Sequence, residues 1–100
     1  MINHNPINEG IQEYKNHMGA VLIDVRTQEE YQDGHIENAI NIPVQEIEKI
    51  KDTILDVSTP IYSYCLSGQR SFKACFKLKE MGYTNVKNIG GINMYKGPIV

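Results

Sequence analysis

The chain has 100 residues, of which 41% are hydrophobic and 22% charged, and its formal net charge is -2. This length suits one domain, and the composition is typical of a globular rather than a disordered protein, so we expect residues 1–100 to form a single domain. The slight acidic excess argues against a nucleic acid or an anionic membrane as the main partner, because both bind basic surfaces.

The first half of the chain predicts alternating helices and strands. Residues 8–18 predict a short helix with Met18 on its apolar face, and the apolar run of residues 20–25 predicts a strand that is covered on both sides. Thr27 and Glu30 have the spacing of a capping box, which predicts the start of a second short helix.

The second half continues this alternation. A helix is predicted after Pro43, which suits the first position of a helix, and a longer one is predicted over residues 71–81. Further strands are predicted over residues 39–42, 61–64 and 86–89. Because short connections join these strands and helices, we expect a three-layer α/β/α fold around a central parallel sheet.

The segment between the strand at residues 61–64 and the next helix carries the predicted chemistry. Cys65 ends the strand, Gly68 permits the positive φ of a tight loop, and Arg70 brings a permanent cation to the start of the helix. Free N–H groups and the dipole at a helix start stabilise an anion, so we predict that Cys65 is a nucleophilic thiolate. The predicted binding loop comprises Leu66, Ser67, Gly68, Gln69, Arg70 and Ser71.

The length of this loop favours sulfur over phosphate as the group that it binds. Four residues separate Cys65 from Arg70. Cysteine enzymes that cleave phosphate esters use a longer loop, because a tetrahedral phosphate has to fit inside it. The shorter ring suits one additional sulfur atom on the cysteine. A buried structural cysteine is the alternative, since free cysteine is among the most buried residue types.

Three segments together resemble the rhodanese family of sulfurtransferases. The loop matches the family's Cys-x-x-Gly-x-Arg pattern, residues 21–43 are similar to its amino-terminal signature, and residues 88–95 are similar to its closing Gly-Gly segment. The matches cover nearly the whole chain. The resemblance implies a five-stranded parallel sheet in the order 3-2-4-5-1, with a brief first strand near residues 1–3 and the active strand in the middle.

The resemblance also implies a double displacement that needs no cofactor. Cys65 takes a sulfane sulfur from thiosulfate, a persulfide or a polysulfide, and passes it to cyanide, a thiol or a sulfur-carrier protein. Leu66 stands where thiosulfate-specialised members often have a basic residue, so a persulfide or polysulfide donor is as plausible as thiosulfate. A non-catalytic binding module and a cysteine-dependent phosphatase are the alternative functions.

Two charged residues and a histidine near the predicted site are expected to be structural. Asp24 and Arg26 resemble family residues near the active pocket, and we interpret both as structural support, with an ion pair between Arg26 and Glu30 as a candidate. His35 is expected to form a hydrogen bond within its turn, because persulfide chemistry does not require a general base. The histidines and cysteines have no metal-site spacing, and no metal is expected.

The second cysteine, Cys75, is expected to pack in the core on the same helix face as Phe72 and Phe76. A disulfide with Cys65 is not expected, because one cysteine begins a loop and the other lies well inside the next helix. This pattern fits a reducing compartment.

We expect a cytoplasmic protein. No apolar run approaches the roughly 20 residues that a membrane-spanning helix needs. Residues 1–6 lack the charged region and apolar core of a secretory signal. A mature exported form is the alternative.

Overall fold

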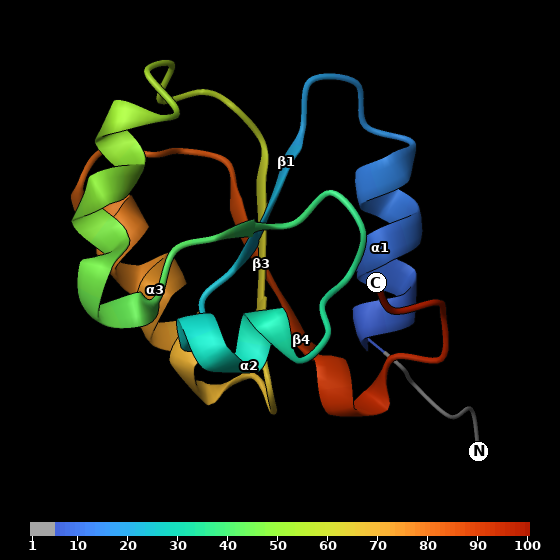
Figure 1. The fold of residues 1–100 in the computed structure, drawn as a ribbon. Helices are drawn as coiled ribbons and strands as arrows, with labels where there is room; N and C mark the ends of the chain where they lie inside the picture. The colour runs from blue at the N-terminus through green and yellow to red at the C-terminus, as the bar shows by residue number, and fades with distance from the viewer. Residues whose placement is uncertain (1–5) are drawn as a thin grey trace.

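The computed structural model describes residues 6–100 and contains a parallel sheet of four strands (Figure 1). The strands are β1 (Val21–Asp24), β2 (Ile40–Asn41), β3 (Ile61–Cys65) and β4 (Val86–Gly91). Their order is β2-β1-β3-β4, and every neighbouring pair is parallel. This order agrees with the predicted order without its first strand. Four strands are thus found rather than five, and the strand predicted near residues 1–3 lies outside the described residues.

Helices cover both faces of the sheet, which gives the predicted three-layer α/β/α fold. α3 (Gln69–Glu80) and the 3-10 helix η1 (Val44–Asp52) lie on one face, and α1 (Pro6–Lys15) lies on the other (Figure 1). α2 (Gln28–Gln32) and η2 (Ile92–Met94) lie at the end of the sheet where the strands finish. Within residues 6–100, none of the helices combines the length and the apolar character needed to cross a membrane.

The two faces of the sheet bury separate apolar clusters, because neighbouring residues of a strand point in opposite directions. Ile23 and Ile61 pack towards η1 and α3, whereas Leu22 and Tyr62 pack towards α1. All five residues of β3 are buried, as expected for a central strand covered on both sides. The packed strand therefore fixes the position of its last residue, Cys65.

The side of α3 that faces the sheet differs from the prediction. The residues buried in α3 follow the i, i+3, i+4, i+7 spacing of one helix face and are Ser71, Ala74, Cys75 and Leu78. Phe72 and Phe76 lie on the other side and remain 67% and 62% exposed. The prediction that Cys75 shares a core face with these phenylalanines is therefore wrong, although Cys75 itself is buried as expected.

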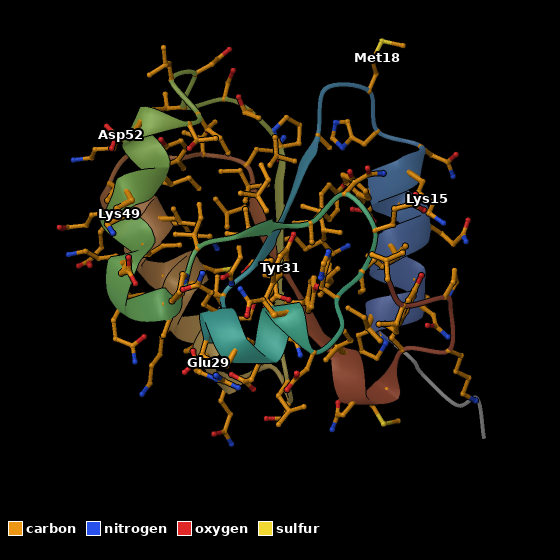
Figure 2. All side chains as sticks on the ribbon, viewed as in Figure 1. Lys15, Met18, Glu29, Tyr31, Lys49 and Asp52 are labelled. Carbon is orange, nitrogen blue, oxygen red and sulfur yellow. The ribbon has the colours of Figure 1, made fainter. Side chains whose placement is uncertain are left out.

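Two predicted helices also differ from the structure. α1 ends at Lys15, so Met18 lies in the turn that follows and is 96% exposed, and Figure 2 shows its side chain pointing away from the fold. The helix predicted after Pro43 is a 3-10 helix with a kink at Glu46.

The capping box at the start of α2 is confirmed. The hydroxyl of Thr27 accepts a hydrogen bond from the Glu30 N–H at 3.2 Å, and the Glu30 carboxylate accepts one from the Thr27 N–H at 3.0 Å. The two contacts satisfy N–H groups that the helix itself leaves without partners.

Candidate active site

The side chain of Cys65 lies inside the curve of the loop that follows β3. Its Sγ atom accepts hydrogen bonds from the N–H groups of Gly68 at 3.0 Å and Ser71 at 3.3 Å. Gly68 has φ of 103°, a conformation that side chains with a Cβ rarely adopt, and this turn directs its N–H at the sulfur. Cys65 is only 1% exposed. Two amide donors at the start of a helix thus stabilise negative charge on a shielded sulfur.

The loop is held in shape by β4 and the residues that follow it. The side-chain amide of Asn88 donates to the carbonyl oxygen of Gly68 at 3.1 Å, and its oxygen accepts from the N–H of Gly90 at 3.0 Å. The N–H of Asn93 donates to the carbonyl oxygen of Leu66 at 3.1 Å. The segment that carries the Gly-Gly pair is therefore a support for the loop, a role that the sequence pattern did not specify.

Gly91 matters at this support because the loop backbone passes directly over it. A Cβ atom on Gly91 would lie 2.2 Å from the carbonyl oxygen of Leu66 and 2.6 Å from the Cα atom of Ser67. The φ of Gly91 is -124°, which any residue adopts without strain. Space alone therefore requires glycine at this position. A glycine inside a strand is the sequence signal for such a close approach.

Arg70 forms an ion pair with Glu30 across the site. Its two terminal nitrogens donate to the two carboxylate oxygens at 2.7 and 3.0 Å, with both side chains about one-third exposed. The hydrogen bond from Arg70, together with those from Thr27, lowers the pKa of Glu30 to about 2 despite the opposing effect of burial. The candidate pair between Arg26 and Glu30 is wrong, because Glu30 binds Arg70 instead. The sequence pattern indicates the capping role of Glu30 but contains no signal for its contact with Arg70.

Arg26 is paired with Asp24, and both are buried. Their side chains are 7% and 0% exposed, and the guanidinium contacts both carboxylate oxygens, with the shortest distance 2.7 Å. The same guanidinium donates to the carbonyl oxygen of Gly34 at 2.7 Å, and the side chain of Asn41 donates to the carbonyl oxygens of Asp24 and Arg26. The pair therefore fixes the turn after β1 at the end of the sheet where Cys65 lies.

Replacing Asp24 with asparagine should destabilise the protein strongly. Asparagine keeps the shape of the side chain but leaves the Arg26 charge buried without its partner, which typically costs about 3–5 kcal/mol. Urea unfolding followed by circular dichroism measures this loss. Glu46→Gln is the matched control, because Glu46 pairs with Lys49 on the exposed side of η1 and its loss should change the unfolding free energy by about 0.5 kcal/mol or less. Equal effects of the two substitutions would contradict a stabilising role for the buried pair.

A small polar cluster lies beneath the loop. The hydroxyl of Ser71 donates to the hydroxyl of Ser63 at 2.8 Å, and both residues are fully buried. Burial raises the pKa of the Cys75 thiol to about 11, against smaller opposing effects of Ser63 and Ser71. Cys75 is thus held as a neutral thiol at neutral pH.

The described residues 6–100 contain no group of histidine, cysteine, aspartate and glutamate side chains that could hold a metal ion.

His35 makes contacts that suit a structural residue. Its Nδ1 atom is 2.8 Å from the carbonyl oxygen of Tyr31, and the two rings stack with their centroids 3.6 Å apart. The backbone of His35 also exchanges two hydrogen bonds with Val100, at 3.0 and 2.9 Å. The hydrogen bond of the His35 ring was expected within its own turn, but its partner is Tyr31 near the end of α2.

The sequence of the chain matches that of a known family. The family model of the rhodanese-like domain matches residues 9–97. The chain belongs to the rhodanese family. It is 45% identical over 71 residues to the thiosulfate sulfurtransferase PspE of Escherichia coli, and the match covers 70% of this chain and 68% of PspE. It is 37% identical over 86 residues to thiosulfate sulfurtransferase 18 of Arabidopsis thaliana, and the match covers 73% of this chain and 63% of that protein.

Solved structures agree with this membership. A rhodanese from E. coli, described as containing anions, has a TM-score of 0.76 and 41% sequence identity to this chain, and the alignment covers 81% of this chain and 96% of that one. The fold and the predicted class of enzyme, a rhodanese-type sulfurtransferase, are thereby confirmed. The non-catalytic and phosphatase alternatives are less well supported than this reading, because the named relatives are sulfurtransferases.

Proposed function

We propose that this rhodanese carries sulfane sulfur on Cys65 and transfers it from a sulfur donor to a thiophilic acceptor. The observation that carries the proposal is the pair of N–H groups, from Gly68 and Ser71, that point at the Sγ atom of Cys65. These donors lie where they can stabilise negative charge that develops on the sulfur during the reaction. The rest of the loop, residues 66–71, supplies the walls around it.

The first step is attack by the Cys65 thiolate on the outer sulfur of the donor. A new sulfur–sulfur bond forms on Cys65, and the donor's own bond to that sulfur breaks. Its electron pair leaves with the rest of the donor, as sulfite from thiosulfate or as a thiolate from a persulfide. The terminal sulfur of the new persulfide carries the negative charge. Backbone N–H groups of the loop stabilise that charge without reorganising.

The second step returns the enzyme to its starting state. An acceptor nucleophile attacks the terminal sulfur, and the Cys65 thiolate leaves with the electron pair of the broken bond. Cyanide becomes thiocyanate in an assay, and a thiol, whether on a small molecule or on a sulfur-carrier protein, becomes a persulfide in a cell. No external oxidant or reductant is consumed, so the cysteine alone is sufficient for the chemistry. A cytoplasmic setting suits such a thiolate, because the compartment keeps it reduced.

The surroundings of the loop favour a singly charged donor over thiosulfate. Leu66 is apolar, and the positive charge of Arg70 is already balanced by Glu30. Arg70 therefore offers a dianion little net positive charge, whereas a persulfide or polysulfide with one terminal charge needs less compensating charge. The names of the relatives make thiosulfate a suitable first donor to test.

Mass spectrometry tests the proposed intermediate. The purified protein is incubated with thiosulfate, cysteine persulfide or polysulfide, and each sample is then treated with cyanide. We expect a gain of about 32 Da on the peptide that contains Cys65, and its loss after cyanide. A protein that stays unmodified with all three donors would contradict the proposal, and hydrolysis of para-nitrophenyl phosphate would support a phosphatase instead.

Replacing Glu30 with glutamine should make thiosulfate a better donor. Glutamine can still close the capping box with Thr27, so the change mainly removes the charge that balances Arg70. We expect the KM for thiosulfate to fall roughly 3- to 10-fold, and the KM for a persulfide to change less, because local positive charge concentrates anions at a site. Glu29→Gln, on the exposed side of the same helix, is the control for charge alone. Equal kinetics of the two variants would contradict the role of the ion pair.

The same variant should change the pH dependence of stability in a defined window. The pKa of Glu30 is lowered from 4.5 to about 2 in the folded protein. A carboxylate with a lowered pKa stabilises the fold above its unfolded value and loses that contribution as the pH falls. The difference in unfolding free energy between wild type and Glu30→Gln should therefore be constant above about pH 5 and shrink between pH 4.5 and about pH 2.

A further inference from the structure

Charge is distributed unevenly along the chain, and the basic part contains the active loop. Residues 1–56 carry eleven acidic and four basic side chains, whereas residues 57–100 carry one acidic and six basic ones. Four of those six basic residues belong to α3, which begins within the active loop. A protein with a small negative net charge therefore presents a basic helix next to Cys65.

The outer face of α3 is apolar as well as basic. Phe72 and Phe76 lie one turn apart and are 67% and 62% exposed, and Lys73 lies between them in an exposed position. Lys73 forms no ion pair within the described part of the chain, in contrast to Arg70, which binds Glu30. Single exposed apolar side chains are common, but two neighbouring aromatic rings beside an unpaired cation mark an interaction surface.

This face continues into a groove beside the loop. The groove has a volume of about 610 Å3, and its lining includes Phe72, Lys73, Ser67 and Gly68. An inorganic donor the size of thiosulfate does not need a groove of this size. Cys65 is only 1% exposed, so a protein can reach its sulfur only with an extended segment, and the body of that protein has to rest on the surface around the loop.

We propose that Phe72, Lys73 and Phe76 form a docking surface for an acceptor protein that presents acidic and apolar side chains next to its sulfur-accepting group. The proposal rests on the function proposed above and names the partner of that same site. Charge complementarity favours a protein of this kind. A nucleic acid is disfavoured, because it requires several unpaired cations, and two of the four basic residues of this helix, Arg70 and Lys77, are paired with glutamates.

Two synthetic peptide acceptors test the proposal. One contains glutamate and leucine and ends in a cysteine thiol, and its twin has lysine in place of each glutamate. The persulfide form of the protein is prepared with cysteine persulfide, and the loss of the additional sulfur is followed with each peptide and with cyanide. At low ionic strength we expect kcat/KM for the acidic peptide to exceed that for its twin by ~10-fold or more, and to fall as salt is added.

Variants of the surface identify the residues responsible. Lys73→Glu should remove or reverse the preference for the acidic peptide, and Phe76→Ser should lower kcat/KM for that peptide roughly 3- to 10-fold. Transfer to cyanide should stay at the wild-type rate in both. Lys15→Glu and Met18→Ser are the matched controls, because both residues are exposed and lie on the α1 side of the molecule (Figure 2). They should leave the peptide preference unchanged.

The outcomes separate the possible occupants. Equal rates with the two peptides, or a preference that Lys73→Glu does not alter, would overturn the proposal. So would inhibition by a single-stranded RNA oligonucleotide that exceeds inhibition by the acidic peptide. A dimer in sedimentation that Phe76→Ser dissociates would overturn it too, by assigning the surface to a second copy of the chain. If the proposed function itself were wrong, no sulfur would be transferred to cyanide either. This result differs from a failure of the docking surface alone, in which cyanide still receives sulfur.

Discussion

Replacing Cys65 with serine should abolish sulfur transfer. A serine hydroxyl holds its proton at neutral pH and cannot form a persulfide, so both steps of the double displacement lose their reacting atom. Removing a covalent nucleophile of this type lowers turnover by roughly 10³-fold or more. The release of thiocyanate from cyanide measures this loss, and the variant should show no gain of sulfur in its mass spectrum.

The second cysteine provides the matched control for this variant. Cys75 is buried and its pKa is raised to about 11, so Cys75→Ser should retain sulfur transfer even if it lowers stability. Thermal unfolding of both variants separates a loss of chemistry from a loss of fold. Sulfur found on Cys75, or turnover that survives in Cys65→Ser, would contradict the assignment of the nucleophile.

Replacing Gly91 with alanine should impair catalysis more than stability. The added Cβ would lie 2.2 Å from the carbonyl oxygen of Leu66, so the loop has to move away from β4. Such a shift misdirects the N–H groups of Gly68 and Ser71, which are the donors to Cys65. Displacing reacting groups by about 1 Å can reduce the rate on the order of 10²-fold. Steady-state kinetics with a small acceptor measures the effect.

Gly82→Ala is the control for the general cost of losing a glycine. Gly82 follows α3 with φ of 103°, and a Cβ atom there would have no atom within 4 Å beyond its own chain neighbours. Alanine therefore adds backbone strain of about 1 kcal/mol without contacting the loop. We expect Gly82→Ala to lower the melting temperature while kcat/KM stays near wild type. A Gly91→Ala protein with wild-type kinetics would show that the loop does not depend on this close approach.

The fold and the position of Cys65 at the end of a strand could be predicted because their signals are local. The apolar run before Cys65 and the loop pattern from Cys65 to Arg70 together predict a strand, a turn and a helix start, and the structure has all three. The capping box at Thr27 and Glu30 is equally local and is confirmed. Each of these features depends on residues fewer than ten positions apart.

The partners of charged side chains could not be predicted, because they depend on packing between distant segments. Glu30 and Arg70 are 40 positions apart, and α2 and the loop meet only once the sheet has formed. Sequence spacing favoured Arg26 as the partner of Glu30, yet Asp24 is nearer to Arg26 and shares its buried environment. Which carboxylate pairs with which arginine depends on the three-dimensional positions of the side chains, and the order of residues in the sequence does not give these positions.

The outward position of Phe72 and Phe76 was missed for a different reason. α3 has apolar side chains around much of its circumference, so its periodicity does not indicate a single buried face. The small residues Ser71 and Ala74, rather than the large rings, lie on the buried side of the helix. Aromatic side chains left outside such a helix are candidates for recognition rather than for the core.

The carboxylate of Glu30 belongs to two structures at once. It closes the first turn of α2 through Thr27 and it holds Arg70 at the first turn of α3. Local opening of either helix start releases a contact of the other, so we expect the backbone amides of the two first turns to exchange their hydrogens together. One side chain of the surface helix α2 is in this way tied to the backbone that surrounds Cys65.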